Sequence, residues 1–177
     1  MNLEAQVESL KSAIRDVPDF PKPGILFKDI TTLLQDAVLF RRAIDMLAVL
    51  CGDLPVEKVV AIESRGFILG GALAHRLGAG FVPVRKPGKL PWRARKAIYT
   101  LEYGTDTLEM HEDGLVANEC VLIVDDVIAT GGTAAAVGRM VEDSGARVGA
   151  FAFLVELSFL DGRRRLGAHD VRSLVRY

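Results

Sequence analysis

Two adjacent carboxylates followed by a small, glycine-containing turn are the strongest chemical feature of this sequence. The segment VLIVDDVIATGGT, residues 121–133, runs from an apolar stretch into Asp125 and Asp126. A buried strand does not hold two adjacent carboxylates without partners, so we expect both at the carboxyl end of a strand, where open α/β sheets bind ligands. Paired carboxylates at that position can accept hydrogen bonds from vicinal hydroxyls or bind a hydrated cation.

The residues after this pair are typical of a phosphate-binding turn. They combine small side chains, two hydroxyls and a run of backbone amides before an expected helix, and they are Ala129, Thr130, Gly131, Gly132 and Thr133. A helix start attracts an anion through its N–H groups and its macrodipole, and glycine lets the backbone approach that anion closely. The segment therefore predicts a site for a ribose 5-phosphate. The sequence has no G-x-x-x-x-G-K-[ST] motif and no G-x-G-x-x-G after a strand, which argues against an ATPase and a dinucleotide dehydrogenase.

A basic segment is a candidate partner for a second anionic group. RKPGKLPWRARK, residues 85–96, contains six basic and no acidic residues, and its prolines and glycine oppose regular structure. Alternating apolar residues at 99–103 then predict a strand, with a turn at 104–106 and a second strand at 107–110. We expect a basic mobile loop followed by a hairpin.

The order of the remaining elements predicts an α/β fold. The expected elements are a helix over 3–14, an extended loop over 17–24, a helix from Asp36 to Gly52, strands over 58–62, 81–84, 120–124 and 148–155, helices that end at Leu77 and Ser144, and a short strand over 171–175. Short apolar runs that alternate with helices are typical of parallel strands covered on both faces. The connections between such strands are right-handed crossovers.

Composition and charge are consistent with one domain that folds by burial of an apolar core. The chain has 177 residues, of which 50% are hydrophobic and 25% charged, and its net charge is −1. This balance gives no general electrostatic reason to expect a nucleic-acid or membrane partner. Cys51 and Cys120 lack the spacing of a metal or redox site, so we expect buried free thiols. With no secretion signal or membrane span in view, the expected location is the cytoplasm.

Residues 121–133 resemble the phosphoribosyl-pyrophosphate signature of the type I phosphoribosyltransferases. The whole chain is similar to the adenine-specific members of that family. The resemblance implies one domain over residues 1–177, with a central parallel sheet and helices on both faces. It also implies a small hood, which includes a base-binding loop around residues 18–35 and a flexible catalytic loop and hairpin around residues 85–112. The implied activity is purine salvage, in which the 5-phosphoribosyl group passes from phosphoribosyl pyrophosphate to adenine and gives AMP and pyrophosphate.

The resemblance assigns the ribose and phosphate contacts residue by residue. Asp125 and Asp126 would hold the ribose hydroxyls, and residues 129–133 would clamp the 5-phosphate. The expected cations around the leaving pyrophosphate are Arg65 in the segment ESRGF, and Arg85, Lys86 and Lys89 in the basic loop. Mg²⁺ is the expected cofactor, held by substrate oxygens and water rather than by protein ligands, because this ion keeps much of its hydration.

Two further segments complete the implied site. In LEYG, residues 101–104, Glu102 would act as the catalytic acid or base, and Tyr103 would help to close the site. In FPKPGILFKDI, residues 20–30, backbone groups near Leu26 and Lys28 would read the edge of the adenine, and Phe27 would pack on its face. The family often has arginine where this chain has Lys28, which makes a bidentate role for that side chain doubtful.

Alternatives remain at this point. Without the resemblance, the basic loop is equally consistent with a solvated face, and Glu102 with an exposed strand residue. A phosphoribosyltransferase for guanine, hypoxanthine or xanthine is the nearest rival, since a 6-oxo base presents an acceptor where adenine presents a donor. A regulator that senses phosphoribosyl pyrophosphate without catalysis would need a DNA-binding extension, for which 177 residues leave no room. Relatives of the family are homodimers, so we expect a homodimer.

Overall fold

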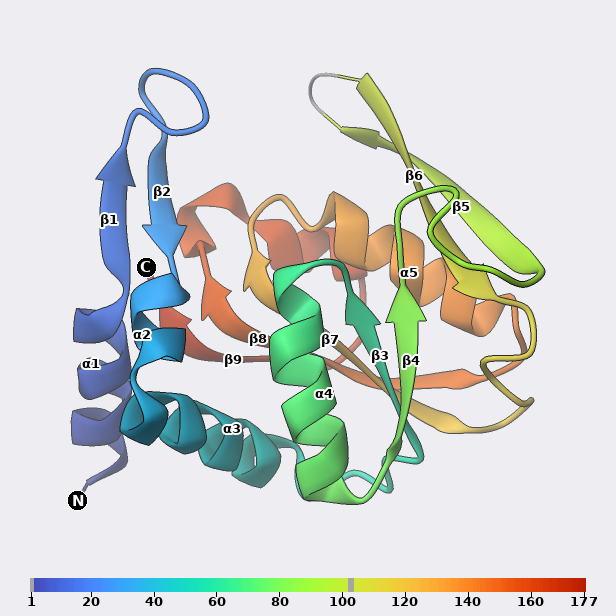
Figure 1. Ribbon diagram of the computed structural model, residues 1–177, viewed down its shortest axis with the longest axis horizontal. Coiled ribbons are helices and arrows are strands. Elements are labelled where there is room, and N and C mark those ends of the chain that lie inside the picture. Colours follow the sequence, from blue (N-terminus) through green and yellow to red (C-terminus); the bar gives the residue numbers. More distant parts are fainter. Residues whose placement is uncertain (1, 102–103) are drawn as a thin grey trace.

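Five short apolar runs form one parallel sheet. They are β3 (Lys58–Ile62), β4 (Gly80–Val84), β7 (Cys120–Ile128), β8 (Arg147–Glu156) and β9 (Val171–Arg176), and they pair in the order β4-β3-β7-β8-β9. The computed structural model, which describes residues 2–101 and 104–177, shows this sheet flanked by helices and by two antiparallel ribbons (Figure 1). The predicted α/β class and parallel sheet are confirmed.

Helices cover both faces of the sheet. On one face, α1 (Leu3–Ala13), α2 (Thr31–Gln35), α3 (Ala37–Cys51) and α4 (Arg65–Leu77) bury their apolar sides in a first core cluster. On the other face, α5 (Gly132–Glu142) packs in a second cluster together with the ribbon of β5 (Ala94–Leu101) and β6 (Gly104–His111). The predicted N-cap of α3 is confirmed, because the Asp36 carboxylate accepts hydrogen bonds from the backbone N–H groups of Val38 and Leu39.

Within the described residues, no helix combines the length and apolar character that crossing a membrane requires.

The strand order places a switch point between β3 and β7. From β3 the chain crosses through α4 to β4 at one edge, whereas from β7 it crosses through α5 to β8 on the other side. Ligands of open α/β sheets bind outside the carboxyl ends of the strands at such a point. The segments that follow β3 and that end β7 are the chemically distinctive ones identified above, so topology alone brings them together.

Two antiparallel ribbons rise on either side of this edge (Figure 1). The first pairs β1 (Arg15–Pro18) with β2 (Leu26–Asp29), so the extended loop expected from residue 17 is in part a strand. The second pairs β5 (Ala94–Leu101) with β6 (Gly104–His111). The predicted turn at 104–106 is wrong, because these residues lie in β6 and pair with residues 99–101. Pairing along the whole ribbon outweighed the local turn preference of glycine and aspartate.

Other boundaries differ from the sequence expectation at strand ends. β7 continues to Ile128 rather than ending at residue 124, because β8 runs beside it and pairs with it as far as Glu156. After β8 the chain forms two short 3₁₀ helices, η1 (Ser158–Leu160) and η2 (Gly162–Leu166), which the sequence did not reveal. Both cysteines are buried free thiols, as predicted, and burial raises the pKa of Cys51 to about 11.

Candidate functional site

A cavity of about 600 Å³ opens at the carboxyl end of the sheet, at the switch point between β3 and β7. Its lining comes from β2, from the turn between β3 and α4, from the end of β7 and from the segment after β8. The lining residues are Ile25, Leu26, Phe27, Lys28, Ile62, Glu63, Ser64, Arg65, Lys86, Leu108, Asp125, Asp126, Val127, Ala129, Thr133, Leu157 and Leu160. The structure therefore brings together most of the residues proposed from the sequence.

The two carboxylates lie inside β7 rather than after it. The Oδ1 atom of Asp125 accepts a hydrogen bond from the backbone N–H of Asp126 at 2.9 Å. Burial, together with the charge of Asp126, raises the pKa of Asp125 well above its usual value. Burial also raises the pKa of Asp126, although the Arg65 guanidinium opposes this shift. The site thus holds two carboxylates whose negative charge is poorly solvated and available to a ligand that brings hydroxyl donors or a cation.

Arg65 connects the carboxylate pair of β7 with the aromatic ring of β2. It begins α4, and its Nε atom lies 2.8 Å from Oδ2 of Asp126. Its guanidinium carbon lies 5.0 Å from the centre of the Phe27 ring. Glycine at position 66 lets the start of α4 lie this close to β7, because a Cβ there would lie 2.8 Å from Oδ1 of Asp125. The contact of Arg65 with a leaving pyrophosphate stays a prediction.

The expected phosphate turn has the geometry of an anion site. Gly131, with φ of +77°, is the N-cap of α5 and makes no side-chain cap hydrogen bond. The N–H groups in the first turn of a helix have no partners within the helix, so they point toward the space in front of it. Residues 127–134 enclose a second, smaller cavity of about 100 Å³ there, which shares Asp125 and Thr133 with the main cavity.

The base side is built on β2. In an antiparallel ladder, hydrogen-bonded pairs alternate with pairs that make no hydrogen bond to each other. Pro18, which pairs with Leu26, has no N–H, so Val17 and Phe27 form the hydrogen-bonded pair. The backbone N–H and C=O groups of Leu26 and Lys28 therefore point away from β1. Both residues line the cavity, which agrees with a backbone role at these positions. The Lys28 ammonium contacts Asp16 at 2.5 Å and lies 3.8 Å from the centre of the Tyr177 ring. The side chain of Lys28 is therefore occupied elsewhere.

The aromatic residue of β2 is placed as expected for contact with a flat ligand. Phe27 is half-buried and lines the cavity. The Phe20 ring packs edge-on against it, with 5.1 Å between the ring centres. One face of a bound base could therefore be covered by an aromatic ring that is itself supported.

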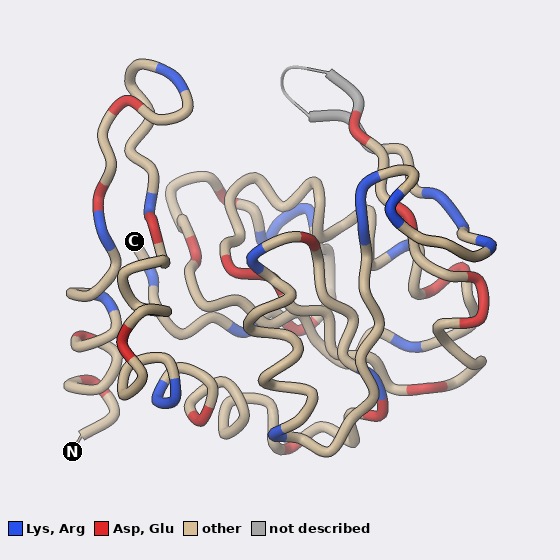
Figure 2. Tube along the Cα trace, viewed as in Figure 1, with Lys and Arg blue, Asp and Glu red and all other residues tan. Residues whose placement is uncertain are grey.

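The basic loop after β4 contributes unequally to the cavity. Figure 2 shows its positive charges beside the β5–β6 ribbon. Lys86 lines the cavity and is exposed, whereas Arg85 donates to Glu63 at 2.9 Å and to the carbonyl of Lys89. Lys89 is exposed and is not among the lining residues. Of the three predicted pyrophosphate cations in this loop, the structure thus brings only Lys86 to the cavity.

Sequence reasoning missed the segment after β8. Leu157 and Leu160 line the cavity opposite β3, and neither was proposed from the sequence. A signal was present, since the apolar residues of LSFL, 157–160, come just after the end of an expected strand. Glu63 was also missed as a separate contributor, although it accepts from the Lys86 backbone N–H and so holds the basic loop at the cavity.

Two predicted residues, Glu102 and Tyr103, lie outside the described residues. β5 ends at Leu101 and β6 begins at Gly104, so the ribbon that carries these two positions is described on both sides of them. Their assigned roles stay predictions.

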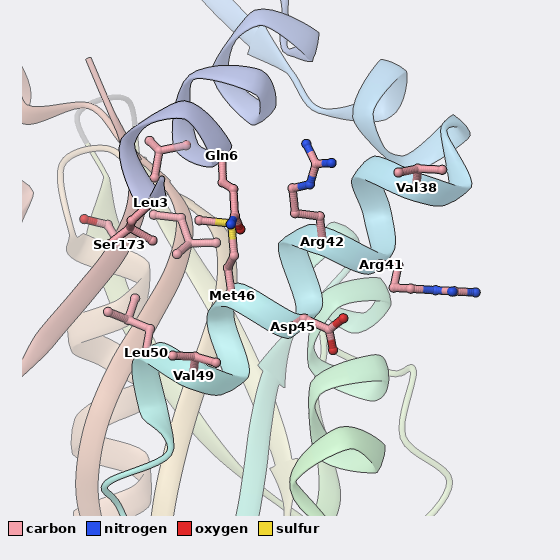
Figure 3. Close-up of a pocket in the computed structure, with 12 residues that line it drawn as sticks. Leu3, Gln6, Val38, Arg41, Arg42, Asp45, Met46, Val49, Leu50 and Ser173 are labelled. Carbon is pink, nitrogen blue, oxygen red and sulfur yellow. The ribbon is translucent and has the colours of Figure 1, made fainter. Parts of the chain in front are cut away.

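A second hollow lies away from this site. It has a volume of about 670 Å³ and lies between α1, α3 and β9 (Figure 3). Its walls are largely aliphatic, with Leu3, Met46 and Leu174 among them, and two arginines lie at its rim. It contains neither the paired carboxylates nor the glycine turn, so we place the functional site at the switch point.

Comparison with known proteins agrees with this placement. A family model described as the phosphoribosyl transferase domain matches residues 39–172. An adenine phosphoribosyltransferase of Solibacter usitatus is 60% identical over 168 residues, which are 95% of this chain and 97% of that protein. The crystal structure of adenine phosphoribosyltransferase from Thermoanaerobacter pseudethanolicus superposes with a TM-score of 0.95, at 50% identity over 97% of this chain and 99% of that one. The enzyme from Saccharomyces cerevisiae, solved with adenine and an imino-altritol bisphosphate, gives 0.91 at 42% identity, with 97% and 99% covered.

Proposed function

The chain belongs to the family of the phosphoribosyl transferase domain, and from this premise we propose that it transfers the 5-phosphoribosyl group of phosphoribosyl pyrophosphate to adenine. The products are AMP and pyrophosphate. The observation that carries the proposal is the placement of Asp125 and Asp126 at the switch point, between the glycine turn of α5 and the aromatic wall of β2. A ribose 5-phosphate joined to a flat base spans these three features in that order.

The two ends of the ribose have separate contacts in this proposal. Asp125 and Asp126 accept hydrogen bonds from the ribose hydroxyls, and their poorly solvated charge favours such donors. Residues 129–133 receive the 5-phosphate at the start of α5. Holding both ends fixes the anomeric carbon between the pyrophosphate and the base, which lowers the entropic part of the barrier.

The reaction breaks the bond from the anomeric carbon to pyrophosphate and forms a bond to a ring nitrogen of adenine. Negative charge grows on the pyrophosphate while the sugar becomes cation-like, so the site has to stabilise both charges. Lys86 and Arg65, two of the cations that line the cavity, serve the first task. The carboxylates of β7 serve the second, and Glu102 accepts the proton that adenine releases.

Magnesium fits the donor set of this site. Apart from its ion pair with Nε of Arg65, Oδ2 of Asp126 has no polar partner among the described residues, and Asp125 beside it offers further oxygens. Among the described residues no group of three or more histidine, cysteine or acidic side chains is placed to hold a metal. The ion would therefore reach the site with the pyrophosphate and its own water, near Asp125 and Asp126. When bound, it supplies positive charge that neutralises the leaving group.

Adenine recognition rests on the backbone of β2. The outward N–H and C=O groups of Leu26 and Lys28 offer a donor and an acceptor to one edge of the base. Phe27 covers one face, and Leu157 and Leu160 close the apolar side. A 6-oxo base would meet this edge with an acceptor in place of the exocyclic amine, which leaves a backbone carbonyl unpaired.

We also propose a cytoplasmic homodimer. The support for pairing is an apolar area around the edge strand β4, where Ile68 is 46% and Phe81 is 41% exposed. The support for location is the pair of buried free thiols, Cys51 and Cys120, which are typical of a reducing compartment.

The test is incubation of the purified protein with Mg²⁺, phosphoribosyl pyrophosphate and one nucleobase at a time. Chromatography should show AMP formed from adenine, and guanine and hypoxanthine should react at least about 10³-fold more slowly at equal concentration. Formation of GMP or IMP at a similar rate would overturn the base assignment. No monophosphate from any base would overturn the transferase.

A substitution at the expected catalytic position tests the mechanism. Glu102→Gln should lower turnover by roughly 10² or more, as loss of general acid or base catalysis typically does. The affinity for phosphoribosyl pyrophosphate should stay nearly intact. Equal turnover in variant and parent would remove Glu102 from this role.

A further inference from the structure

We infer that Arg163 and Glu156 are positioning residues that set the shape of the phosphate turn through Gly162. This inference rests on the proposed function and deepens it, because it names what holds the 5-phosphate turn from behind. Neither Arg163 nor Glu156 lines the main cavity or the smaller cavity in front of α5. Their effect on substrate would therefore be transmitted by the backbone.

The first observation is a direct backbone contact between the phosphate turn and η2. A Cβ added to Gly162 would collide with the carbonyl oxygen of Ala129, and a Cβ added to Gly131 would collide with the carbonyl oxygen of Gly162. The two chain segments are thus packed without any side chain between them. A shift of Gly162 must move residues 129–131 or break the contact.

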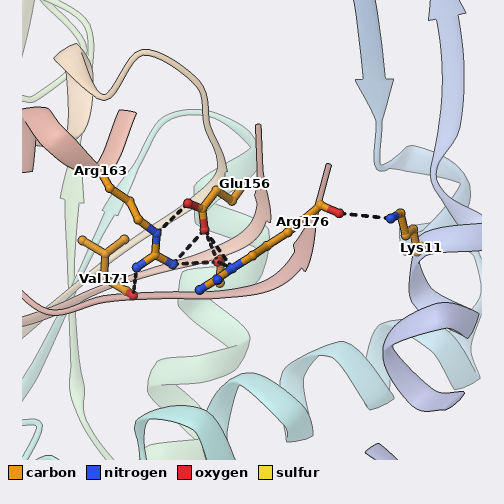
Figure 4. A network of polar contacts seen from close by, with 6 residues as sticks. Lys11, Glu156, Arg163, Val171 and Arg176 are labelled. Carbon is orange, nitrogen blue, oxygen red and sulfur yellow. Dashed lines mark hydrogen bonds and ion pairs between the residues drawn. The ribbon is translucent and has the colours of Figure 1, made fainter. Parts of the chain in front are cut away.

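The second observation is the anchor of the segment that carries Gly162. Glu156 is the last residue of β8, and it is only 6% exposed. The guanidinium of Arg163 donates to it twice, from Nε to Oε1 at 2.5 Å and from Nη2 to Oε2 at 2.7 Å (Figure 4). A third donor of Arg163, Nη1, contacts the carbonyl of Val171 at 2.6 Å. Arg163 directly follows Gly162, so this fork fixes Gly162 relative to β8 and β9.

Residues 157–162, which lie between Glu156 and Arg163, also reach the base side of the site. Leu157 donates its backbone N–H to the carbonyl of Ile128 at 3.0 Å, and Leu157 and Leu160 line the main cavity. Residues 157–162 therefore connect the wall of the base pocket with the back of the phosphate turn. The ion pair between Glu156 and Arg163 joins the two residues that flank this segment.

Charge explains why the anchor is strong. The Arg163 fork and the hydroxyl of Ser173, which also contacts the carboxylate, lower the pKa of Glu156. Arg176 adds a contact to the same carboxylate, from Nε to Oε2 at 3.2 Å, but it lies in β9 and its side chain is 60% exposed. Arg176 thus shares the carboxylate of Glu156 without belonging to residues 157–162, which makes it a matched control.

The experiment compares Gly162→Ala, Arg163→Ala, Arg163→Lys and Arg176→Ala with the parent enzyme. We measure KM for phosphoribosyl pyrophosphate, KM for adenine, kcat, inhibition by ribose 5-phosphate and the thermal unfolding midpoint. Gly162→Ala should raise KM for phosphoribosyl pyrophosphate and the inhibition constant of ribose 5-phosphate about tenfold or more, because small misplacements of a binding loop are costly. KM for adenine should change by less than about twofold, since the added methyl group presses on the carbonyl of Ala129 and leaves the contacts of β2 with the base in place.

The arginine variants distinguish positioning from stability. Arg163→Ala should raise the KM values of both substrates, since it releases the Gly162 end of a segment that also carries Leu157 and Leu160, and Arg163→Lys should recover part of this loss because it keeps the charge without the planar fork. Arg176→Ala should leave both KM values within about twofold of the parent. If Arg163→Ala does not fold, Arg163→Lys carries the test, with an intermediate rise in both KM values expected.

Two results would overturn the inference. One is a lower unfolding midpoint with unchanged KM values in the Arg163 variants. The other is an equal change of KM in Arg163→Ala and Arg176→Ala. In either case the parent still forms AMP, so the proposed function stands, whereas failure of the parent to form AMP rejects the proposed function instead.

Discussion

The ribose-phosphate side and the base side of the cavity are built in opposite ways. Asp125 and Asp126 lie on the central strand β7, which pairs with β3 as far as Val124 and with β8 as far as Ile128. Leu26 and Phe27 lie on β2, which belongs to a two-stranded ribbon with exposed residues along much of its length. In the proposed function, the part that positions the reacting carbon is therefore rigid, and the part that reads the base lies on a peripheral element. Isolated two-stranded ribbons are marginally stable in water, so β2 depends on contacts from outside its ribbon.

The carboxyl groups of the two sides show the same contrast. Burial raises the pKa values of Asp125 and Asp126 on β7. On β2, hydrogen bonds from the Arg15 guanidinium and from Thr31 lower the pKa of Asp29 to about 2. The aspartates of β7 thus have poorly solvated carboxyl groups that are available to a ligand, whereas the aspartate of β2 has a well-paired carboxylate that holds the ribbon.

The largest expected effect is on the rigid side. Asp126→Asn removes the charge that we propose to hold the ribose hydroxyls, and it removes the charged partner of Arg65. We expect kcat/KM for phosphoribosyl pyrophosphate to fall about 10²-fold or more, the typical cost of losing one preorganised polar group. The control is Asp113→Asn, an exposed carboxylate that does not line the cavity. Equal kinetics in both variants would contradict the assignment of the carboxylates.

A smaller effect is expected on stability, and it depends on pH because the pKa of Asp125 on β7 is raised, whereas that of Asp29 on β2 is lowered. Since the pKa of Asp125 is raised in the folded protein, its ionisation destabilises the fold as pH rises above about 4, the value expected in the unfolded chain. Asp125→Asn should therefore raise the unfolding midpoint at pH 8 by about 2–4 °C, and this gain should shrink toward pH 4. Calorimetry at both pH values measures it. A lower midpoint at pH 8 would show that the charge of Asp125 is stabilising.

On the base side, a modest effect is expected from the contact that holds β2 to the sheet. The Lys28 ammonium lies over the Tyr177 ring, and the backbone of Tyr177 is hydrogen-bonded to that of Glu156. Tyr177→Leu should raise KM for adenine at least about 2–5-fold, the worth of an exposed cation–π contact, because the Lys28 side chain is only 10% exposed. Tyr177→Phe keeps the ring and should behave as the parent. A rise of KM for phosphoribosyl pyrophosphate instead would break the division into two sides.

The smallest effect is expected from the exposed ion pair of the ribbon. Asp29→Asn weakens the contact with Arg15, and we expect KM for adenine to rise by about twofold at most, as surface ion pairs contribute little. Asp29 has a lowered pKa, so its contribution is fully present above about pH 4 and is lost only as pH falls through about 2. The ratio of variant to parent should therefore be constant between pH 5 and 9, and hydrogen exchange should be faster in β1 and β2. A ratio that changes across this range would contradict the lowered pKa.

The local parts of the fold could be read from the sequence because their signals are local. Apolar runs and caps predicted β3, α4 and β4 closely, and Asp36 caps α3 as its position suggested. The carboxylate pair and the glycine turn were predicted because each is a contiguous motif whose chemistry does not depend on distant residues. The turn of the β5–β6 ribbon was misplaced, since strand pairing over eight residues overrode the turn preference at Gly104.

The sequence by itself determined the alternation of strands and helices, the ribose-phosphate chemistry of residues 121–133 and the family resemblance. Only the tertiary structure decided which side chains share the cavity: it placed Leu157 and Leu160 there, left Arg85 paired with Glu63, and turned Lys28 toward Tyr177. It also packed Gly162 against the phosphate turn. Periodicity and turn chemistry act between neighbours in the chain, whereas these contacts join residues that only the crossovers of the sheet bring together.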